Sequence, residues 1–198
     1  MKQEEITLKT KKAMANSLKK TMKQKPFSKI TIKDIITDCN VNRNTFYYHF
    51  EDIYGLLHWM FDNEAIQVVQ NFNFMTDYEE AIRFVIDYVE QNDHILNCAL
   101  DSIGQKELNH LFYPEFCNII ASFLNKAQEQ LHIALDPDYQ EFLIHFYTEA
   151  LAGMLVEWIR KKASSTASTK ENFIAYVSST LKHSLQGIFS NSSLCHKA

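Results

Sequence analysis

The side chains best suited to bind another molecule lie between Thr31 and Phe50, in the segment TIKDIITDCNVNRNTFYYHF. Phe46 and Phe50 are four residues apart, so both can turn toward a protein core. The other side chains of the same short helix all carry hydrogen-bonding groups: Arg43, Asn44, Thr45, Tyr47, Tyr48 and His49. A short helix that is anchored by one face and offers donors and flat rings on the other suits the major groove of DNA.

Local signals predict the two helices that position these side chains. Thr31 can cap a first helix, with Asp34 completing a capping box, and Asn42 can cap the second helix. The first helix has one apolar stripe at helical spacing, formed by Ile32, Ile35 and Ile36. The sequence therefore predicts a helix-turn-helix, although an ordinary helical corner with a polar surface would show the same pattern.

Charge is divided unevenly along the chain. Residues 1–50 contain eleven Lys and Arg against four Asp and Glu, a net charge of +7, whereas residues 51–198 contain nine against twenty, a net charge of −11. The lysines around the helix-turn-helix are Lys9, Lys11, Lys12, Lys19, Lys20, Lys23, Lys25, Lys29 and Lys33. A basic run is most often a solvated face, but cations clustered beside a reading helix suit the phosphate backbone of DNA.

The same region resembles the DNA-binding domain of TetR-family transcription regulators over about residues 7–65. The matching segments are Ile30–Ile35, Asn44–Phe50 and Leu56–Leu57. Many members have a phosphate-binding Lys where this chain has Ile53, so that contact is absent or moved to another cation. The resemblance implies DNA contacts by Lys33, Arg43, Asn44, Thr45, Tyr47, Tyr48 and His49.

A second part of the resemblance lies further along the chain. Gly153–Trp158, before the final helix, is similar to the C-terminal region of the same family. Tyr48–Tyr54 followed by His58–Phe61 resembles the subgroup that contains the dihydroxyacetone kinase operon activator. The family implies a regulator that binds a double-stranded operator as a homodimer.

Composition favours an all-α fold. The 198 residues are 46% hydrophobic and include only four Gly and three Pro, so long stretches lack helix breakers. We expect no membrane-spanning run, because charged or Asn residues interrupt each apolar stretch, and we see no secretory signal. The four cysteines are scattered without a CxxC motif, which favours a cytoplasmic protein with reduced thiols.

Periodicity and capping signals divide the chain into a head and a body. We expect a three-helix DNA-binding head at residues 1–52, a larger helical effector-binding and dimerisation domain at 53–189, and a flexible polar tail at 190–198. Expected helices cover residues 7–24, 52–72, 76–91, 93–103, 114–131, 136–162 and 168–189, with capping boxes at 76–79 and 168–171.

The last two expected helices have apolar faces that could meet a second copy of the chain. The candidate interface residues are Phe146, Ala150, Gly153, Met154, Trp158, Val177, Leu181 and Leu185. These stripes could equally fill the core of the monomer. A dimer would set two reading helices about one turn of DNA apart, or a multiple of it, which allows a palindrome to be read.

Enzyme signatures are missing, since no Gly-rich phosphate loop, GxSxG or HExxH motif occurs. We therefore expect no catalysis and no cofactor. An effector pocket in the body could use Tyr88, His94, Cys98, Phe112 and Phe116. His94 and Cys98 have a spacing that metals can share, but we expect no metal site. A small-molecule effector, a protein coactivator, and a helical interaction protein without a DNA role remain as alternatives.

Overall fold

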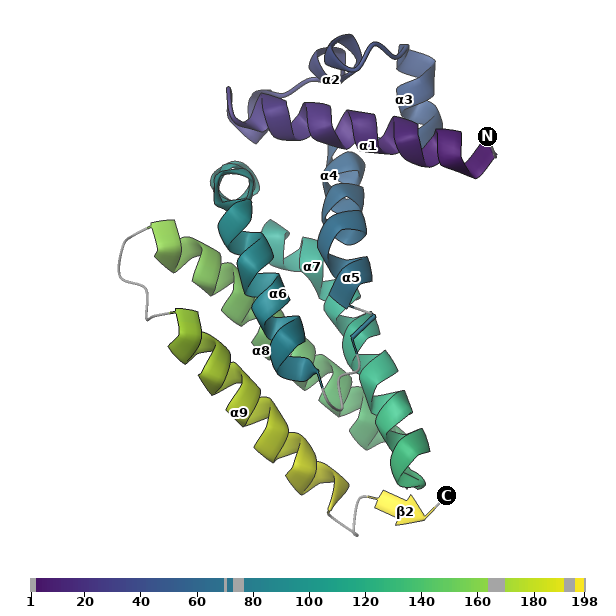
Figure 1. Ribbon diagram of the computed structural model, residues 1–198, viewed down its shortest axis with the longest axis vertical. Coiled ribbons are helices and arrows are strands. Elements are labelled where there is room, and N and C mark those ends of the chain that lie inside the picture. The colour runs from purple at the N-terminus through teal and green to yellow at the C-terminus, as the bar shows by residue number, and fades with distance from the viewer. Residues whose placement is uncertain (1–2, 70, 73–76, 164–169, 191–194, 198) are drawn as a thin grey trace.

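The computed structural model describes residues 3–69, 71–72, 77–163, 170–190 and 195–197. A small helical head stands on a longer helical body, and one helix, α4, runs from the head down into the body (Figure 1). The helices are α1 Gln3–Met22, α2 Ile32–Asp38, α3 Arg43–His49, α4 Ile53–Phe61, α5 Gln67–Val69, α6 Tyr78–Gln91, α7 Asp93–Leu131, α8 Pro137–Ala163 and α9 Lys170–Phe189. The all-α fold predicted from the sequence is confirmed.

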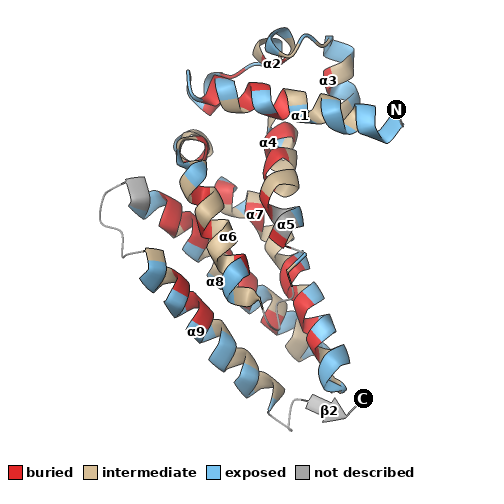
Figure 2. Cartoon of the chain, viewed as in Figure 1, coloured by how far each residue is buried: buried red, intermediate tan, exposed pale blue. Residues whose placement is uncertain are grey.

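The head forms around a core that α1, α2, α3 and α4 share. Met14, Leu18, Ile35 and Phe46 are fully buried there, and Figure 2 shows their elements turning buried faces toward one another. Leu8, an apolar residue near the N-terminal end of α1, is 42% exposed, because α1 extends beyond the core at that end. The buried apolar side chains of the head are continuous with those of the body, because they belong to one core cluster.

The turn between α2 and α3 has the capping that the sequence predicted. Thr31 and Asp34 form a reciprocal capping box at the start of α2. Asn42 caps α3, because its side-chain oxygen accepts a hydrogen bond of 2.7 Å from the backbone N–H of Thr45. These caps fix where the reading helix begins.

The connection into the body is less regular than a single helix over residues 52–72. Asp52 caps α4 by accepting a 2.8 Å hydrogen bond from the backbone N–H of Gly55. After Phe61, the helix widens into the π-helical segment Asp62–Ile66 before α5. Such π-segments are frequent at functional sites, since they re-aim side chains within an otherwise regular helix.

Helix α7 consists of two helical parts joined across a kink, and it differs from the expectation in where the second part begins. Its first part ends at Gly104, whose φ of 83° breaks the helical path, as the expected end near Ile103 implied. The expected second start at Pro114 is wrong, because Pro114 lies inside the helix. Leu108 and Phe112 are buried in the preceding turn, and their packing holds the helix although Pro114 lacks a backbone donor.

The later elements begin near the expected positions. At the start of α8, Asp136 Oδ1 accepts hydrogen bonds of 3.1 Å from the backbone N–H groups of Asp138 and Tyr139. The expected capping residues Thr76 and Ser168 lie outside the described residues, whereas α6 and α9 begin at Tyr78 and Lys170.

Two further expectations need correction. Within the predicted flexible tail, Cys195–Lys197 forms strand β2, which pairs antiparallel with strand β1, Ile133–Leu135. Helix α8 also has one stretch, Pro137–Lys161, that is long and apolar enough to cross a membrane by length and composition alone. In the most apolar part of that stretch 44% of the residues are buried, and α8 packs along α7.

Candidate DNA-binding surface and body cavity

Helix α3 separates its buried and exposed side chains sharply. Phe46 is fully buried and Phe50 is 6% exposed, so both anchor the helix in the head. Tyr48 is 78% exposed and Tyr47 is 48% exposed, although large aromatic side chains are usually more buried. Arg43 and Asn44, in the first turn, are also exposed. The outer face of α3 therefore presents donors and rings to any molecule that approaches the head.

Arg43 and Tyr47 support one another on this outer face. The Arg43 guanidinium donates a 3.1 Å hydrogen bond to the Tyr47 hydroxyl and lies 5.4 Å from the centre of its ring. Thr45 has a different role, because its hydroxyl donates to Asn42 at 3.1 Å and so helps to cap α3. Thr45 therefore helps to fix the start of α3. In this arrangement its hydroxyl oxygen is available only as a hydrogen-bond acceptor.

His49 lies half-buried at the end of α3, next to the Tyr48 ring at a centroid distance of 4.9 Å. Burial, and secondarily the charge of Lys11, lowers the pKa of the His49 imidazole below its usual value. Lys11 itself lies 5.6 Å from the ring centres of both Phe50 and Trp59. A neutral His49 can donate one hydrogen bond to a phosphate without adding charge.

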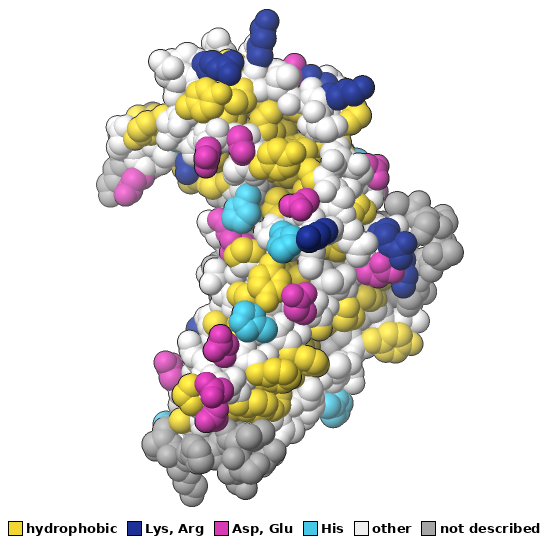
Figure 3. Space-filling model, turned by 180° about the vertical axis from the view of Figure 1, so that it is seen from behind, with side chains coloured by type: hydrophobic (Ala, Val, Ile, Leu, Met, Phe, Trp, Pro, Cys, Tyr) yellow, Lys and Arg dark blue, Asp and Glu magenta, His cyan; other side chains and the backbone are white. Residues whose placement is uncertain are grey.

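The cations around the head fall into two groups. Lys19, Lys20 and Lys25 form ion pairs with Glu64, Asp38 and Asp34, so part of the expected positive charge is neutralised. A second group is exposed on the surface and consists of Lys9, Lys12, Lys23, Lys29 and Lys33. Figure 3 shows Lys and Arg side chains at the head end and acidic side chains mainly on the body.

Ile53 stands where many related proteins have a phosphate-binding lysine. It begins α4 and packs half-buried against the core of the head. Lys33, at the start of α2, is exposed and offers a cation near α3. Lys33 is thus a candidate for the phosphate contact that Ile53 cannot make.

Side chains of the head and the body meet at Glu64, in the π-helical segment. One carboxylate oxygen of Glu64 pairs with Lys19 of α1 and also accepts a 3.0 Å hydrogen bond from the Tyr88 hydroxyl of α6. Burial first, and then the Glu64 charge, raises the pKa of Tyr88, so the phenol stays protonated and donates. Beside this link, the rings of Phe61 in α4 and Phe112 in α7 lie 5.5 Å apart. Glu64 therefore joins α1 of the head to α6 of the body.

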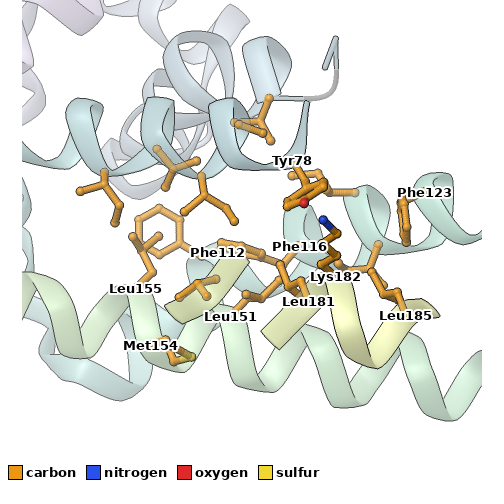
Figure 4. Close-up of a pocket in the computed structure, with 18 of the residues that line it drawn as sticks. Tyr78, Phe112, Phe116, Phe123, Leu151, Met154, Leu155, Leu181, Lys182 and Leu185 are labelled. Carbon is orange, nitrogen blue, oxygen red and sulfur yellow. The ribbon is translucent and has the colours of Figure 1, made fainter. Parts of the chain in front are cut away.

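The body encloses a cavity of about 460 Å³ between α6, α7, α8 and α9. Three of the five expected effector residues line it: Tyr88, Phe112 and Phe116. Figure 4 shows aromatic and aliphatic side chains from several helices pointing into this space. Its volume lies within the range of small-molecule sites, about 300–1,000 Å³.

His94 and Cys98 do not line the cavity, so these two expectations need correction. The Cys98 thiol lies 3.7 Å from the backbone oxygen of Lys25, which places it against the head. His94 is half-buried near Asp93, with 3.8 Å between Nδ1 and the carboxylate. Both lie on the first part of α7, before the Gly104 kink, and face away from the cavity. Among the described residues, no cluster of three or more His, Cys, Asp or Glu could hold a metal.

The expected dimer residues also divide into two groups. Phe146 is 55% exposed, Met154 is 39% exposed, and Ala150 is exposed on the same helix. Trp158 and Val177 are instead buried within the monomer, where the Trp158 ring lies 4.5 Å from that of Phe173.

Leu181 and Leu185 of α9 line the cavity, and so does Met154 of α8, which is also 39% exposed. The sequence analysis missed Phe142, which is 58% exposed and stacks on Phe146 with a centroid distance of 5.9 Å. Its position four residues before Phe146 on one helix face was the available signal. We call Phe142, Phe146, Ala150, Gly153 and Met154 the α8 stripe.

Comparison with known proteins places two family profiles on this chain. A profile described as bacterial regulatory proteins of the tetR family matches residues 18–60. A profile described as a transcriptional regulator C-terminal region matches residues 76–183, which is more than half of the chain. The first match contains α2 and α3, and the second contains most of the cavity lining.

Individual relatives give the same picture. The HTH-type dhaKLM operon transcriptional activator DhaS of Lactococcus lactis subsp. lactis (strain IL1403) is 22% identical over 150 residues, which are 76% of this chain and 79% of that relative. The solved structure of a dihydroxyacetone kinase operon activator DhaS superposes with a TM-score of 0.67 at 17% identity, covering 89% of this chain and 96% of that chain. The structural likeness shows a shared fold.

Proposed function

The chain belongs to the TetR family of bacterial transcriptional regulators, and we propose that α3 is the helix with which it reads operator DNA. The observation that supports this most is the outer face of α3, where Tyr48 and Arg43 are exposed on a helix anchored by a fully buried Phe46. In helix-turn-helix proteins, the first residues of the second helix contact base edges. Arg43 would then pair with a guanine, and Asn44 with an adenine.

The rest of the head would grip the DNA backbone. We assign phosphate contacts to Lys33, Thr45, Tyr47 and His49, with Tyr48 reaching either a base or the backbone. Lys33 supplies charge, Tyr47 and His49 supply hydrogen-bond donors, and the Thr45 hydroxyl would turn from Asn42 to donate to a phosphate. Backbone contacts of this kind fix the register of α3 and hold it against the groove. A regulator that works on bacterial DNA acts in the cytoplasm, and no catalytic step is needed for this function.

We further propose that two chains bind one operator through the α8 stripe. The stacked Phe142 and Phe146 rings and the exposed Met154 form an apolar face on α8. A Cβ placed at Gly153 would meet no atom within 4 Å, so the helix surface there is open to a partner. A second copy of this chain would cover the face and bring two reading helices to one DNA duplex.

Regulation would act through the state of the body. A molecule that prefers one arrangement of the cavity shifts the population of that arrangement. Tyr88 lines the cavity and donates to Glu64, and Glu64 pairs with Lys19 in the head. A change at Tyr88 would therefore reach α1 through two side-chain contacts.

The second candidate has a protein coactivator in place of the small effector. The α8 stripe favours it, because exposed stacked aromatic rings suit a protein partner. The related DhaS is described as a transcriptional activator, and we infer the same sign of regulation for this chain.

An electrophoretic shift with the DNA upstream of the gene for this chain tests the proposed function. We expect a shifted band that survives an excess of random duplex, and a footprint with two-fold symmetry. Binding that random DNA removes completely would contradict sequence-specific recognition. If the protein bound no DNA at all, the remaining hypothesis would be a helical protein that interacts with other proteins.

A further inference from the structure

The polar groups of the cavity lie on one side of it. Lys182, Gln186 and Ser190 follow one another at four-residue spacing along α9 and its end, so they share one face. Tyr78, the first residue of α6, joins them. The other described lining residues are apolar, except for Tyr88. One side of the cavity is thus polar, and its remaining wall is almost entirely hydrocarbon.

Lys182 is the one charged residue among the described residues that line the cavity. In the described part of the chain, no carboxylate forms an ion pair with it, whereas Lys170 on the same helix is bound to both Asp87 and Glu90. Lys182 is exposed and Tyr78 is half-buried, so the polar side lies at the mouth of the cavity. Figure 4 shows the nitrogen of Lys182 and the oxygen of Tyr78 pointing toward one another.

The inner end of the cavity offers no free polar group of this kind. Tyr88 lines it, but the Tyr88 hydroxyl donates its proton to Glu64 at 3.0 Å. The surrounding inner lining includes the rings of Phe61 and Phe112 and the side chain of Leu96. A ligand group placed there would lose its water without gaining a hydrogen bond, so only an apolar group fits well.

We propose that the cavity binds an amphiphile with a hydrocarbon tail and a carboxylate head. Lys182 and Tyr78 bind the head at the mouth, and the tail extends toward Phe112 and Tyr88. One lysine and one phenol match a singly charged head, whereas a phosphate is most often bound by several cations or by Arg. This inference rests on the effector mechanism proposed above and assigns the chemical class of that effector.

The arrangement also accounts for how a bound tail would be sensed. A tail that reaches Tyr88 would press on the side chain whose hydroxyl is bonded to Glu64. The ligand head would remain at the surface, near α9, and the signal would pass from the tail end. The length of the ligand's hydrocarbon tail would then affect regulation more strongly than it affects binding of the ligand's carboxylate.

Calorimetric titration of the full chain with dodecanoate tests this assignment directly. Methyl dodecanoate and dodecyltrimethylammonium, both used below their micelle concentrations, keep the tail and change the head. We expect dodecanoate to bind about tenfold more tightly than either, the amount that one charge-assisted hydrogen bond supplies. Lys182→Met should reduce dodecanoate affinity by about the same factor, and Lys126→Met, on the outer face of α7, should leave it unchanged.

Three results would overturn the proposal: no binding of any of the three amphiphiles, equal affinity for the acid and the ester, or unchanged dodecanoate affinity in Lys182→Met. Operator binding, measured separately with and without dodecanoate, distinguishes this inference from the proposed function. Selective dodecanoate binding without a change in operator affinity would support the ligand site and contradict the effector mechanism. Absent operator binding both with and without dodecanoate would contradict the DNA-binding proposal alone.

Discussion

The head and the body use aromatic side chains in opposite ways. In the head, Phe46 is fully buried, while Tyr47 and Tyr48 are exposed. In the body, the rings of Phe112 and Phe116 border a cavity of about 460 Å³. A close-packed head presents one fixed surface, as recognition of a regular duplex requires. A body that leaves space can change its packing when the space is filled.

Phe46→Ala should have the largest effect on the stability of the head relative to the body. Removing a fully buried ring from the small core of the head should lower its free energy of unfolding by about 3–5 kcal/mol. Hydrogen exchange of the α1–α3 amides, measured next to that of the α6–α9 amides, would locate the loss in the head. Tyr48→Ala is the matched control, since an exposed ring should change stability by no more than about 0.5 kcal/mol. Equal loss of protection in both regions would show that the head has no core of its own.

Arg43→Ala tests the exposed face of the head. The variant should lose about 1–3 kcal/mol of binding free energy on the operator and relax selection at one base pair. Lys33→Ala provides the contrast, because a lost phosphate contact should weaken operator and random DNA alike and lower the salt slope by about one unit. Anisotropy titrations on both duplexes measure these effects. If Arg43→Ala weakened both duplexes equally, Arg43 would not read a base.

Glu64→Gln addresses the link between the two regions. The amide keeps an acceptor for Tyr88 but removes the charge that holds Lys19, so the coupling between cavity and head should weaken by about 0.5–2 kcal/mol. The measurement is the ratio of operator affinities with and without the cavity ligand. Glu129→Gln, on the exposed end of α7, serves as the control. An unchanged ratio would mean that the signal passes through another contact, such as Phe61 against Phe112.

The smallest effect concerns acid stability of the head. The hydrogen bond from Lys25, followed by those from Thr31, lowers the pKa of Asp34 from 3.8 to about 2. Because the folded pKa lies below the unfolded value, the contribution is complete above about pH 4 and disappears as the pH falls toward 2. Asp34→Asn should therefore be less stable than the wild type at neutral pH, with a difference that shrinks on acidification. Thermal unfolding of both proteins across that pH range measures this difference. A difference that stays constant with pH would contradict the role of Asp34.

Local patterns made most of the head predictable. Capping by Thr31 and Asn42, and burial of Phe46 and Phe50, depend on residues three to four positions apart, so the sequence shows them directly. The body depends on contacts between distant helices. The apolar stripes did not reveal that Trp158 and Val177 face inward, whereas Phe142 faces out.

The candidate pocket was predictable only in part for a related reason. Aromatic residues near one another in sequence indicated Phe112 and Phe116. Leu96 of α7 also lines the cavity, but Cys98 contacts the head and His94 lies beside Asp93, on other sides of the same helix. Lys182 and Tyr78 come from helices more than a hundred residues apart in the chain, and no spacing rule joins them.

Sedimentation velocity with a labelled operator duplex tests whether two heads bind DNA together through contact of their α8 stripes. Gly153→Glu places a charge on the stripe at a position where an added Cβ meets no atom within 4 Å, so we expect the monomer to fold. Ser122→Glu, on the exposed face of α7, is the control. We expect two wild-type chains per duplex, the same for Ser122→Glu, and folded monomers with lost operator affinity for Gly153→Glu. One wild-type chain per duplex at full affinity, or an unchanged dimer in Gly153→Glu, would contradict the account.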